Sequence, residues 1–439
     1  MYYQQLLKKE LGIIISLIIV LCFVGQSFAF TEPPYIPVTK PTPTATKTVC
    51  ASGCDYSTLS AANSAAQPGW LIKVKAGTYS PITWTKSGTS GNEIVIEAFG
   101  DGDAIINCTG TSRFSVAGSY IIFDGGPNRQ LVFNGEGLTG PTALDTFRTD
   151  GYYSPHHVTI SRIVVHGSMK NSCAGDGTNI GIGGDNIKVY NSVSYEACDE
   201  GFYIEGSPNG GVNIEIKNNL VRDNDGSGIQ ANPHNNGTYA ADNLSISGNA
   251  VYNNGFRKWH YNNDYRSGIT LYSNSDTLRN TYIYNNLIWN NKAAGIEVGP
   301  YSNINVRVYN NTVYNNIGYG LLYTYTQPTI TTKNNISYAN RGSDTTRGTM
   351  ANNLIAVVGG PDPGFVSIDV NNSDYLKITS SSTNTVDKGA DLTSEGIKTD
   401  ILGNRRPINL FDIGAFEYNP GVPLNEAPAV PQAVRKVLQ

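Results

Sequence analysis

A phrase rich in Asn and Gly recurs through the middle of the chain. It appears as YNSVSYEACDEGFYIEG, NNLVRDNDGSGIQAN, NNLIWNNKAAGIEVG and NNTVYNNIGYGLLYT, and its anchoring Asn falls at 191, 219, 249, 286, 311 and 335. The steps between these positions are 28, 30, 37, 25 and 24 residues. A period in the twenties, made of short strands and turns without a helical pattern, is typical of a solenoid in which each repeat buries its apolar face against its neighbours.

The best match for this period is an all-β fold, the right-handed parallel β-helix. With 47 Gly, 27 Tyr and only 15% charged residues in 439, the composition disfavours a helix-rich architecture. Alternation places Ile296 and Val298 inside and Glu297 outside, and the same pattern puts Val313, Leu321 and Tyr323 in the interior. The Asn side chains are expected to stack from coil to coil, since an amide both donates and accepts hydrogen bonds. Gly residues then open the next strands, at positions 201, 228, 268, 295 and 320.

Two further stretches sharpen this interpretation. CDYSTLSAANSAAQPGWLIKVKAGTYSP, residues 54–81, resembles the opening of pectate-lyase-like β-helix proteins: a short amphipathic helix, a Pro-Gly turn and a strand. Such a helix would cover the open end of the solenoid, whose unpaired edge otherwise invites association. LGNRRPINLFDIGAFEY, residues 402–418, is similar to the choice-of-anchor motif at the C-terminus of secreted bacterial β-helix proteins. The resemblance implies the pectate-lyase-like superfamily and a secreted protein.

The ends of the chain predict its domain organisation. Residues 1–29 have a basic start, an apolar run from Leu11 to Val24 and small residues before Ala29, the order of a secretory signal peptide. The alternative, a permanent anchor, is less favoured because this run is short of a full bilayer span. The prediction is therefore a Pro/Thr-rich exposed linker over 30–48, a β-helix domain over 49–418 and a flexible tail over 419–439. Within the domain, 49–80 would cap the N-terminal end and 355–418 the C-terminal end.

Net charge limits the kinds of partner that this chain can bind, and the cysteines indicate which disulfides it can form. Removing residues 1–29, with two Lys and one Glu, takes the net charge from −4 to −5, so nucleic acid is an unsuitable partner. We expect a monomer, extracellular or at the cell surface, without a membrane span after cleavage. Five cysteines remain after residues 1–29 are removed, and Cys50 and Cys54 among them are expected to pair. Because the count is odd, at least one thiol stays free, and the pairing of the others is left open.

Aligning the repeats on their strand-opening Gly predicts columns of outward side chains. One column holds Tyr203, Gln230, Thr270, Glu297 and Leu322, and the next holds Glu205, Asn232, Tyr272 and Gly299. The longest step contains the insertion GFRKWHYNNDYRS, and an earlier turn carries His234. A loop with an aromatic ring and cations beside such a face suits a sugar chain, although a merely solvated loop is the alternative. The predicted substrate-binding residues are Tyr203, Glu205, Gln230, Asn232, Trp259, Tyr272 and Glu297.

ACDEGFYIEG, residues 197–206, is similar to the paired-carboxylate turn of calcium-dependent pectate lyases. The resemblance implies Ca²⁺ at Asp199 and Glu200, and Asp176, Asp223 and Asp225 on neighbouring coils are candidates for further oxygen ligands. The alternative is that these are ordinary turn acids. Those lyases carry a basic residue where this chain has Gln230, so a base must come from elsewhere. The candidates are Lys258, His260, Arg266 and His234.

The functional expectation is cleavage of an acidic, uronate-containing polysaccharide by β-elimination. The same groups would serve a C5-epimerase, and a glycoside hydrolase would need two carboxylates facing each other across the bond. A non-catalytic adhesin or carbohydrate-binding rod is the rival from outside enzymology.

Overall fold

The computed structural model describes most of the chain beyond residue 29. The described residues are 30–140, 144–149, 154–173, 176–206, 211–233, 240–256, 266–272, 277–299, 303–324, 330–345, 347–407 and 410–420. The predicted signal peptide and residues 421–439 of the predicted tail lie outside them. Within these ranges, no helix has the length and apolar character needed to cross a membrane.

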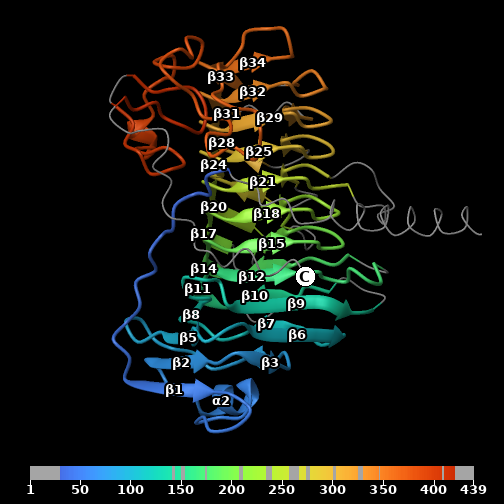
Figure 1. Ribbon diagram of the computed structural model, residues 1–439, viewed down its shortest axis with the longest axis vertical. Coiled ribbons are helices and arrows are strands. Elements are labelled where there is room, and N and C mark those ends of the chain that lie inside the picture. Colours follow the sequence, from blue (N-terminus) through green and yellow to red (C-terminus); the bar gives the residue numbers. More distant parts are fainter. Residues whose placement is uncertain are drawn as a thin grey trace, which may run out of the picture.

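The described strands form three parallel sheets that the chain visits in turn, which makes the molecule a parallel β-helix (Figure 1). Sheet A is the longest. Its strands, in spatial order, are β1 (Ala45–Val49), β2 (Trp70–Val74), β5 (Ile94–Ala98), β8 (Ile121–Asp124), β11 (His156–Ser161), β14 (Asp185–Tyr190), β17 (Gly211–Lys217), β20 (Ala240–Ser247), β24 (Tyr282–Tyr284), β28 (Val306–Tyr309), β31 (Ile330–Lys333) and β33 (Thr349–Ala351), with β23 (Thr277–Arg279) beside β20 and β27 (Asn303–Ile304) beside β23.

Sheets B and C complete each coil. Sheet B contains β3 (Gly77–Tyr79), β6 (Ala104–Gly110), β9 (Leu131–Leu138), β12 (Ile163–His166), β15 (Val193–Tyr195), β18 (Leu220–Arg222), β21 (Ala250–Tyr252), β25 (Leu287–Trp289), β29 (Thr312–Tyr314), β32 (Ile336–Tyr338) and β34 (Leu354–Ala356). Sheet C contains β4 (Thr83–Trp84), β7 (Phe114–Val116), β10 (Phe147–Thr149), β13 (Ile180–Gly183), β16 (Phe202–Gly206), β19 (Ile229–Ala231), β22 (Ile269–Leu271), β26 (Ile296–Val298) and β30 (Leu321–Tyr323).

The N-terminal end of the solenoid is closed as the sequence predicts. Helix α2 (Leu59–Ala65) lies at this end, and its first turn is capped by Thr58, whose hydroxyl accepts a hydrogen bond from the backbone N–H of Ala61. Leu59 and Ala62 are buried in the same apolar core as the strand interiors. The disulfide between Cys50 and Cys54 forms here, and Cys108 is a buried free thiol.

Two rows of stacked Asn side chains run through the interior turns. The first, between sheets A and B, joins Asn219, Asn249, Asn286, Asn311, Asn335 and Asn353, with amide-to-amide distances of 2.9–3.0 Å. The second, between sheets B and C, joins Asn224, Asn254, Asn291, Asn316 and Asn340. The predicted Asn ladder is thus confirmed, and the structure adds a second one. One position differs from the prediction: Ser192, and not Asn191, occupies the first ladder in its coil, where the backbone N–H of Ser192 donates to the Asn219 side chain.

The strand-opening glycines are required by close approach rather than by backbone angle. A Cβ on Gly268 would lie 2.5 Å from Ile288 Cγ2 and 2.8 Å from Asn291 Nδ2. The neighbouring side chain of sheet B and the second ladder therefore occupy the space that any side chain would need.

A third row of Asn residues, just before the first ladder, has left-handed backbone angles and faces outward. In the early coils these amides hold the N-terminal segment: Asn191 exchanges hydrogen bonds with the backbone of Ile36, and Asn218 donates to the carbonyl of Pro34. In the later coils Asn285 and Asn310 bind the C-terminal region in the same way. One structural position thus fastens both ends of the domain.

The prediction of an exposed linker over residues 30–48 is wrong. Phe30 packs edge-on against Tyr252 and Trp289, and Lys40 forms ion pairs with Glu97 and Asp124. The segment runs beside the coils and ends in strand β1 (Figure 1). Composition misleads here because partners on the solenoid, and not the segment's own sequence, keep it in place.

The described residues 357–407 and 410–418 form a region of loops with one short 3₁₀ turn, η1 (Thr393–Glu395), beside the last coils (Figure 1). The stretch that resembles the anchor motif supplies its core. Arg406 donates to Glu417 at 2.6 Å and to Asn285 Oδ1 at 3.1 Å, while Phe411 packs with Leu392, Ile397 and Tyr309. Burial is the main cause that raises the pKa of Glu417, to about 7.

Candidate functional site

The outer face of sheet C carries the columns that the repeat alignment predicts. Strand pairing aligns Tyr203 with Gln230, Gln230 with Thr270, Thr270 with Glu297, and Glu297 with Leu322. Backbone hydrogen bonds between successive coils place Asn232, Tyr272 and Gly299 in a second column, two residues further along the chain than the first. The structure also extends the first column toward the N-terminus, where Arg148 aligns with Gly181 and Gly181 with Tyr203.

The polar groups of this face are largely buried. Gln230 and Asn232 are each 8% exposed, and neither Gln230 Oε1 nor Asn232 Oδ1 accepts a hydrogen bond from any described residue. Native proteins rarely leave buried amide oxygens without donors, so such atoms in a surface site indicate a place for a ligand's hydroxyl groups. Glu297, two strands further along the same column, is held in place by Ser267, whose hydroxyl donates to its carboxylate at 2.8 Å.

Asp199 and Glu200 lie at the edge of sheet C that leads into β16. Glu200 is 6% exposed and accepts a hydrogen bond from Thr178 at 3.0 Å. Burial, followed by the charges of Glu200, Asp176 and Asp225, raises the pKa of Asp199 well above its ordinary value. Burial also raises the pKa of Glu200, which shares a hydrogen bond with Asp199. Two carboxyls in this position share a proton more readily than they ionise together.

A second charged group lies two coils away, on the coil that ends in β10. Asp145 is within 3.6 Å of an Arg148 nitrogen, and Arg148 reaches Glu205 at 3.5 Å. Burial outweighs the attraction of Arg148 and raises the pKa of Asp145 to about 6. Asp145, Arg148 and Thr178 were not predicted from the sequence, because the coils before Asn191 lack the Asn anchors on which the repeats were aligned.

The remaining predicted site residues are distributed as follows. Asp223 forms an ion pair with Arg222 at the edge of sheet B. Asp225 is fully buried, and its charge helps to raise the pKa of Asp199. Arg266 is buried and donates to the carbonyl of Gly255 at 3.4 Å. His234, Lys258, Trp259 and His260 lie outside the described residues, in segments that follow β19 or precede β22 in the sequence.

A disulfide ties together two of the segments that carry acids. Cys173 bonds to Cys198, which directly precedes Asp199, and Asp176 is three residues after Cys173. The connectivity left open by the sequence is thereby resolved for this pair: it links successive coils.

We expect the Cys173→Ser/Cys198→Ser double variant to lose roughly 3 kcal/mol of unfolding free energy, because the bond closes a loop of intermediate length in the unfolded chain. Urea unfolding measures this loss. The pair at Cys50 and Cys54 encloses a separation of only 4 residues, against 25 for Cys173 and Cys198, so its removal should cost less. Equal losses would contradict the loop-length explanation.

The raised pKa values predict how stability depends on pH. Asp145, Asp199 and Glu200 bind protons in the folded state at pH values where the unfolded chain has released them. Their contribution to unfolding free energy should therefore fall as the pH rises from about 4 toward 7. Urea unfolding across this range, without divalent cations, should show a shallower decline for the Asp199→Asn/Glu200→Gln variant than for the wild type. Parallel curves would show that these carboxyls titrate normally.

A divalent cation is compatible with this acid cluster in donor chemistry, although its geometry is not preformed. Among the described residues, no three His, Cys, Asp or Glu side chains are already arranged to hold a metal ion. Asp199, Glu200, Asp176 and Asp225 nevertheless supply the carboxylate oxygens that Ca²⁺ prefers, and their mutual repulsion is the kind that a cation relieves.

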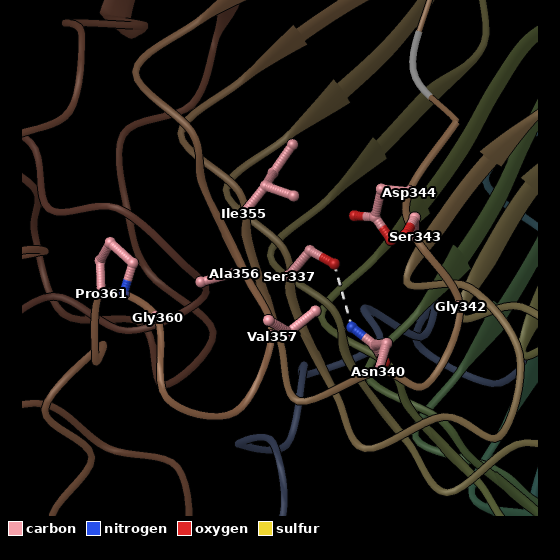
Figure 2. A pocket seen from close by; sticks show the side chains of 10 residues that line it. All are labelled: Ser337, Asn340, Gly342, Ser343, Asp344, Ile355, Ala356, Val357, Gly360 and Pro361. Atoms are coloured by element: carbon pink, nitrogen blue, oxygen red, sulfur yellow. Dashed lines mark hydrogen bonds between the residues drawn. The ribbon is translucent and has the colours of Figure 1, made fainter.

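A pocket of about 410 Å³ lies elsewhere, at the C-terminal end of the solenoid (Figure 2). Ser337, Asn340 and Asp344 form its polar wall, and Ile355 and Val357 lie on its apolar side. Five coils separate it from Asp199, on the order of 24 Å at the usual strand spacing. We assign it no part in the reaction.

Comparison with solved structures identifies the same architecture in polysaccharide lyases. The crystal structure of pectate lyase Pel9A superimposes with a TM-score of 0.62 and 20% sequence identity, covering 86% of this chain and 98% of that one. The fold is shared with these lyases. A rhamnogalacturonan lyase gives a TM-score of 0.54 at 15% identity, covering 77% of this chain and 97% of its own. No family model and no curated protein matches the sequence. At these identities the likeness establishes the fold alone.

Proposed function

We propose that this protein cleaves an acidic, uronate-containing polysaccharide by β-elimination on the outer face of sheet C. The observation that carries the proposal is the buried acid cluster of Asp199 and Glu200, which leads into β16, together with the unsatisfied amide oxygens of Gln230 on the neighbouring strand β19 and of Asn232 just after it. A solenoid with a purely structural role would not be expected to keep these groups, because buried carboxyls and buried amide oxygens without hydrogen-bond donors both lower the stability of the fold. The shared fold with pectate and rhamnogalacturonan lyases supports this class of substrate.

In the proposed mechanism, Gln230 and Asn232 bind the sugar. Their amide oxygens accept from hydroxyl groups, and their NH₂ groups donate to oxygens of the uronate. Among the described residues, Arg148 is a cation of this face that can meet a uronate carboxylate, since its guanidinium reaches Glu205 on β16, and withdrawing charge from that carboxylate stabilises the enolate-like state formed when the C5 proton leaves. Breaking of the C4–oxygen bond then yields an unsaturated sugar and a new chain end.

Asp199, Glu200, Asp176 and Asp225 are the residues that would hold Ca²⁺. When bound, the ion would neutralise the uronate carboxylate and so favour removal of the C5 proton. Without it, these carboxyls keep a shared proton and offer no cation to the substrate. The proposal for Ca²⁺ predicts that the ion raises the melting temperature more above pH 7 than near pH 5, where protons compete for the same oxygens.

The base is proposed to be Lys258, His260, His234 or Arg266. Each of the four belongs to, or directly follows, a segment joined to β19 or β22, the strands that carry Gln230 and Thr270. Replacing each by Ala in turn and measuring the rate of elimination identifies the base. If all four variants retain full activity, the base lies elsewhere.

A hydrolase is less well supported because the acids of the predicted columns are far apart. Glu205 lies on β16 and Glu297 on β26, with β19 and β22 between them. At about 4.8 Å per strand they are on the order of 14 Å apart, beyond the separation used by inverting or retaining glycosidases.

The proposal is tested by incubating residues 30–439 with polygalacturonate, alginate or a glycosaminoglycan, with and without Ca²⁺. Ultraviolet absorbance from unsaturated uronate ends is expected to rise with at least one of these polymers. New reducing ends without that absorbance would indicate a hydrolase, and a change in C5 configuration without cleavage would indicate an epimerase. Binding without any product would leave a carbohydrate-binding protein, and each of these results would overturn the proposal.

A further inference from the structure

Two cations lie in one row on the turns between sheets B and C, in the coils beyond the acid cluster. The N–H of Lys292 donates to the carbonyl of Asn254, that of Ile317 to Asn291, and that of Arg341 to Asn316. These bonds repeat from coil to coil, so Lys292 and Arg341 occupy equivalent positions two coils apart. Their backbones are about 10 Å apart along the axis.

Two aromatic rings lie exposed beside these cations. Phe256 is 46% exposed, and the Lys292 ammonium is 5.8 Å from its ring centroid. Tyr319 is 38% exposed and lies against the backbone of Gly342, where an added Cβ would come within 3.0 Å of its ring. Gly342 also lines the terminal pocket (Figure 2), so the cations and rings extend from the middle coils to the end of the solenoid.

No carboxylate in the described part of the chain neutralises the charges of this surface. Neither Lys292 nor Arg341 lies within 4.0 Å of a carboxylate in the described part of the chain, whereas Lys40, Arg162 and Lys170 are all paired. In a chain with net charge −4, two neighbouring unpaired cations form a local positive field. Such a field attracts a polyanion, and exposed rings pack against the apolar faces of sugars.

The row begins at the acid cluster itself. Asp225 occupies the same position of its coil, followed by Gly255, Lys292, Ile317 and Arg341 in successive coils, as their N–H bonds to the preceding coil show. A polysaccharide chain lying along this row would therefore have the acids at one end and the cations and exposed rings toward the other.

We propose that Phe256, Lys292, Tyr319 and Arg341 bind an anionic polysaccharide chain that extends from the candidate site toward the C-terminal end of the solenoid. The inference rests on the proposed function and specifies it: the substrate is a polymer with several carboxylates, and this surface binds the sugars beyond the reacting one. Short oligosaccharides that fill only the reacting position gain nothing from it.

The test uses a Glu200→Gln background, so that binding is measured without turnover. Lys292→Ala/Arg341→Ala is expected to weaken polygalacturonate binding about tenfold at low salt, which corresponds to about 1.4 kcal/mol. Binding of digalacturonate should change little, and added salt should reduce the difference between the variants. Phe256→Ala/Tyr319→Ala should weaken polymer binding with less dependence on salt.

The matched control is Lys388→Ala/Lys398→Ala, which removes the same charge from exposed positions in the C-terminal region. It should bind polygalacturonate like the parent. Equal polymer affinity in the Lys292→Ala/Arg341→Ala variant and the parent would overturn the inference. If the wild type binds polymer through these residues but never forms unsaturated ends, the proposed reaction fails while the binding surface stands.

Discussion

Glu200→Gln is expected to lower kcat/KM for the acidic polysaccharide at least ~100-fold while leaving the fold intact. Gln is nearly isosteric with Glu and can keep the hydrogen bond with Thr178, so the local packing survives. It removes the negative charge that a bound cation would require at this position. Because burial and repulsion destabilise the ionised pair, the melting temperature of the variant should equal or exceed that of the wild type at neutral pH.

The matched control for this change is Glu136→Gln. Glu136 lies on β9 in sheet B, where it pairs with Lys170 at 3.2 Å, away from the proposed reaction. Its replacement should leave kcat/KM within about twofold, since surface ion pairs contribute little. If Glu200→Gln and Glu136→Gln retain equal activity, the acid cluster has no role in catalysis.

Asn311→Asp is expected to destabilise the protein by roughly 3–5 kcal/mol at neutral pH, although it changes only one NH₂ group to oxygen. The Asn311 amide accepts from Asn286 and donates to the carbonyl of Ile283 and to Asn335. A carboxylate cannot make either donation, so it would face two acceptors in a buried site. Protonation restores one donor, so the loss should be smaller near pH 4 than at pH 7.

Asn315→Asp provides the comparison within the same repeat. Asn315 is exposed, has a left-handed backbone that Asp tolerates, and donates to Asn290 at 2.8 Å. Its replacement should cost less than about 1 kcal/mol. Urea unfolding of both variants measures the difference, and similar losses would show that burial of the ladder contributes little to stability.

The fold could be predicted because its repeating unit is written in the sequence. Once Asn219 and its equivalents are aligned, strand positions, interior residues and outward columns follow from the coil geometry, and the structure confirms them from Tyr203 to Leu322. The second ladder could have been found by the same means, since Asn224, Asn254 and Asn291 recur at a constant offset of five residues from the first.

Other features depend on contacts that no repeat encodes. Arg148 and Asp145 belong to coils that lack the Asn anchor, so nothing in the sequence aligned them with Tyr203. The N-terminal segment resembles a linker in composition, yet Asn191 and Asn218 hold it against the solenoid. Asp223 and Asp225 are two residues apart on either side of the buried Asn224, yet Asp223 pairs with Arg222 whereas the charge of Asp225 raises the pKa of Asp199.

The location of the substrate tests the account most directly. A crystal structure of the Glu200→Gln variant with a galacturonate oligomer should show a uronate over β16 and β19, within hydrogen-bonding distance of Gln230 Oε1 or Asn232 Oδ1. The chain should continue toward Lys292 and Arg341. An oligomer bound only to sheet A or sheet B, with the face of sheet C empty, would contradict the central claim that this face carries the chemistry.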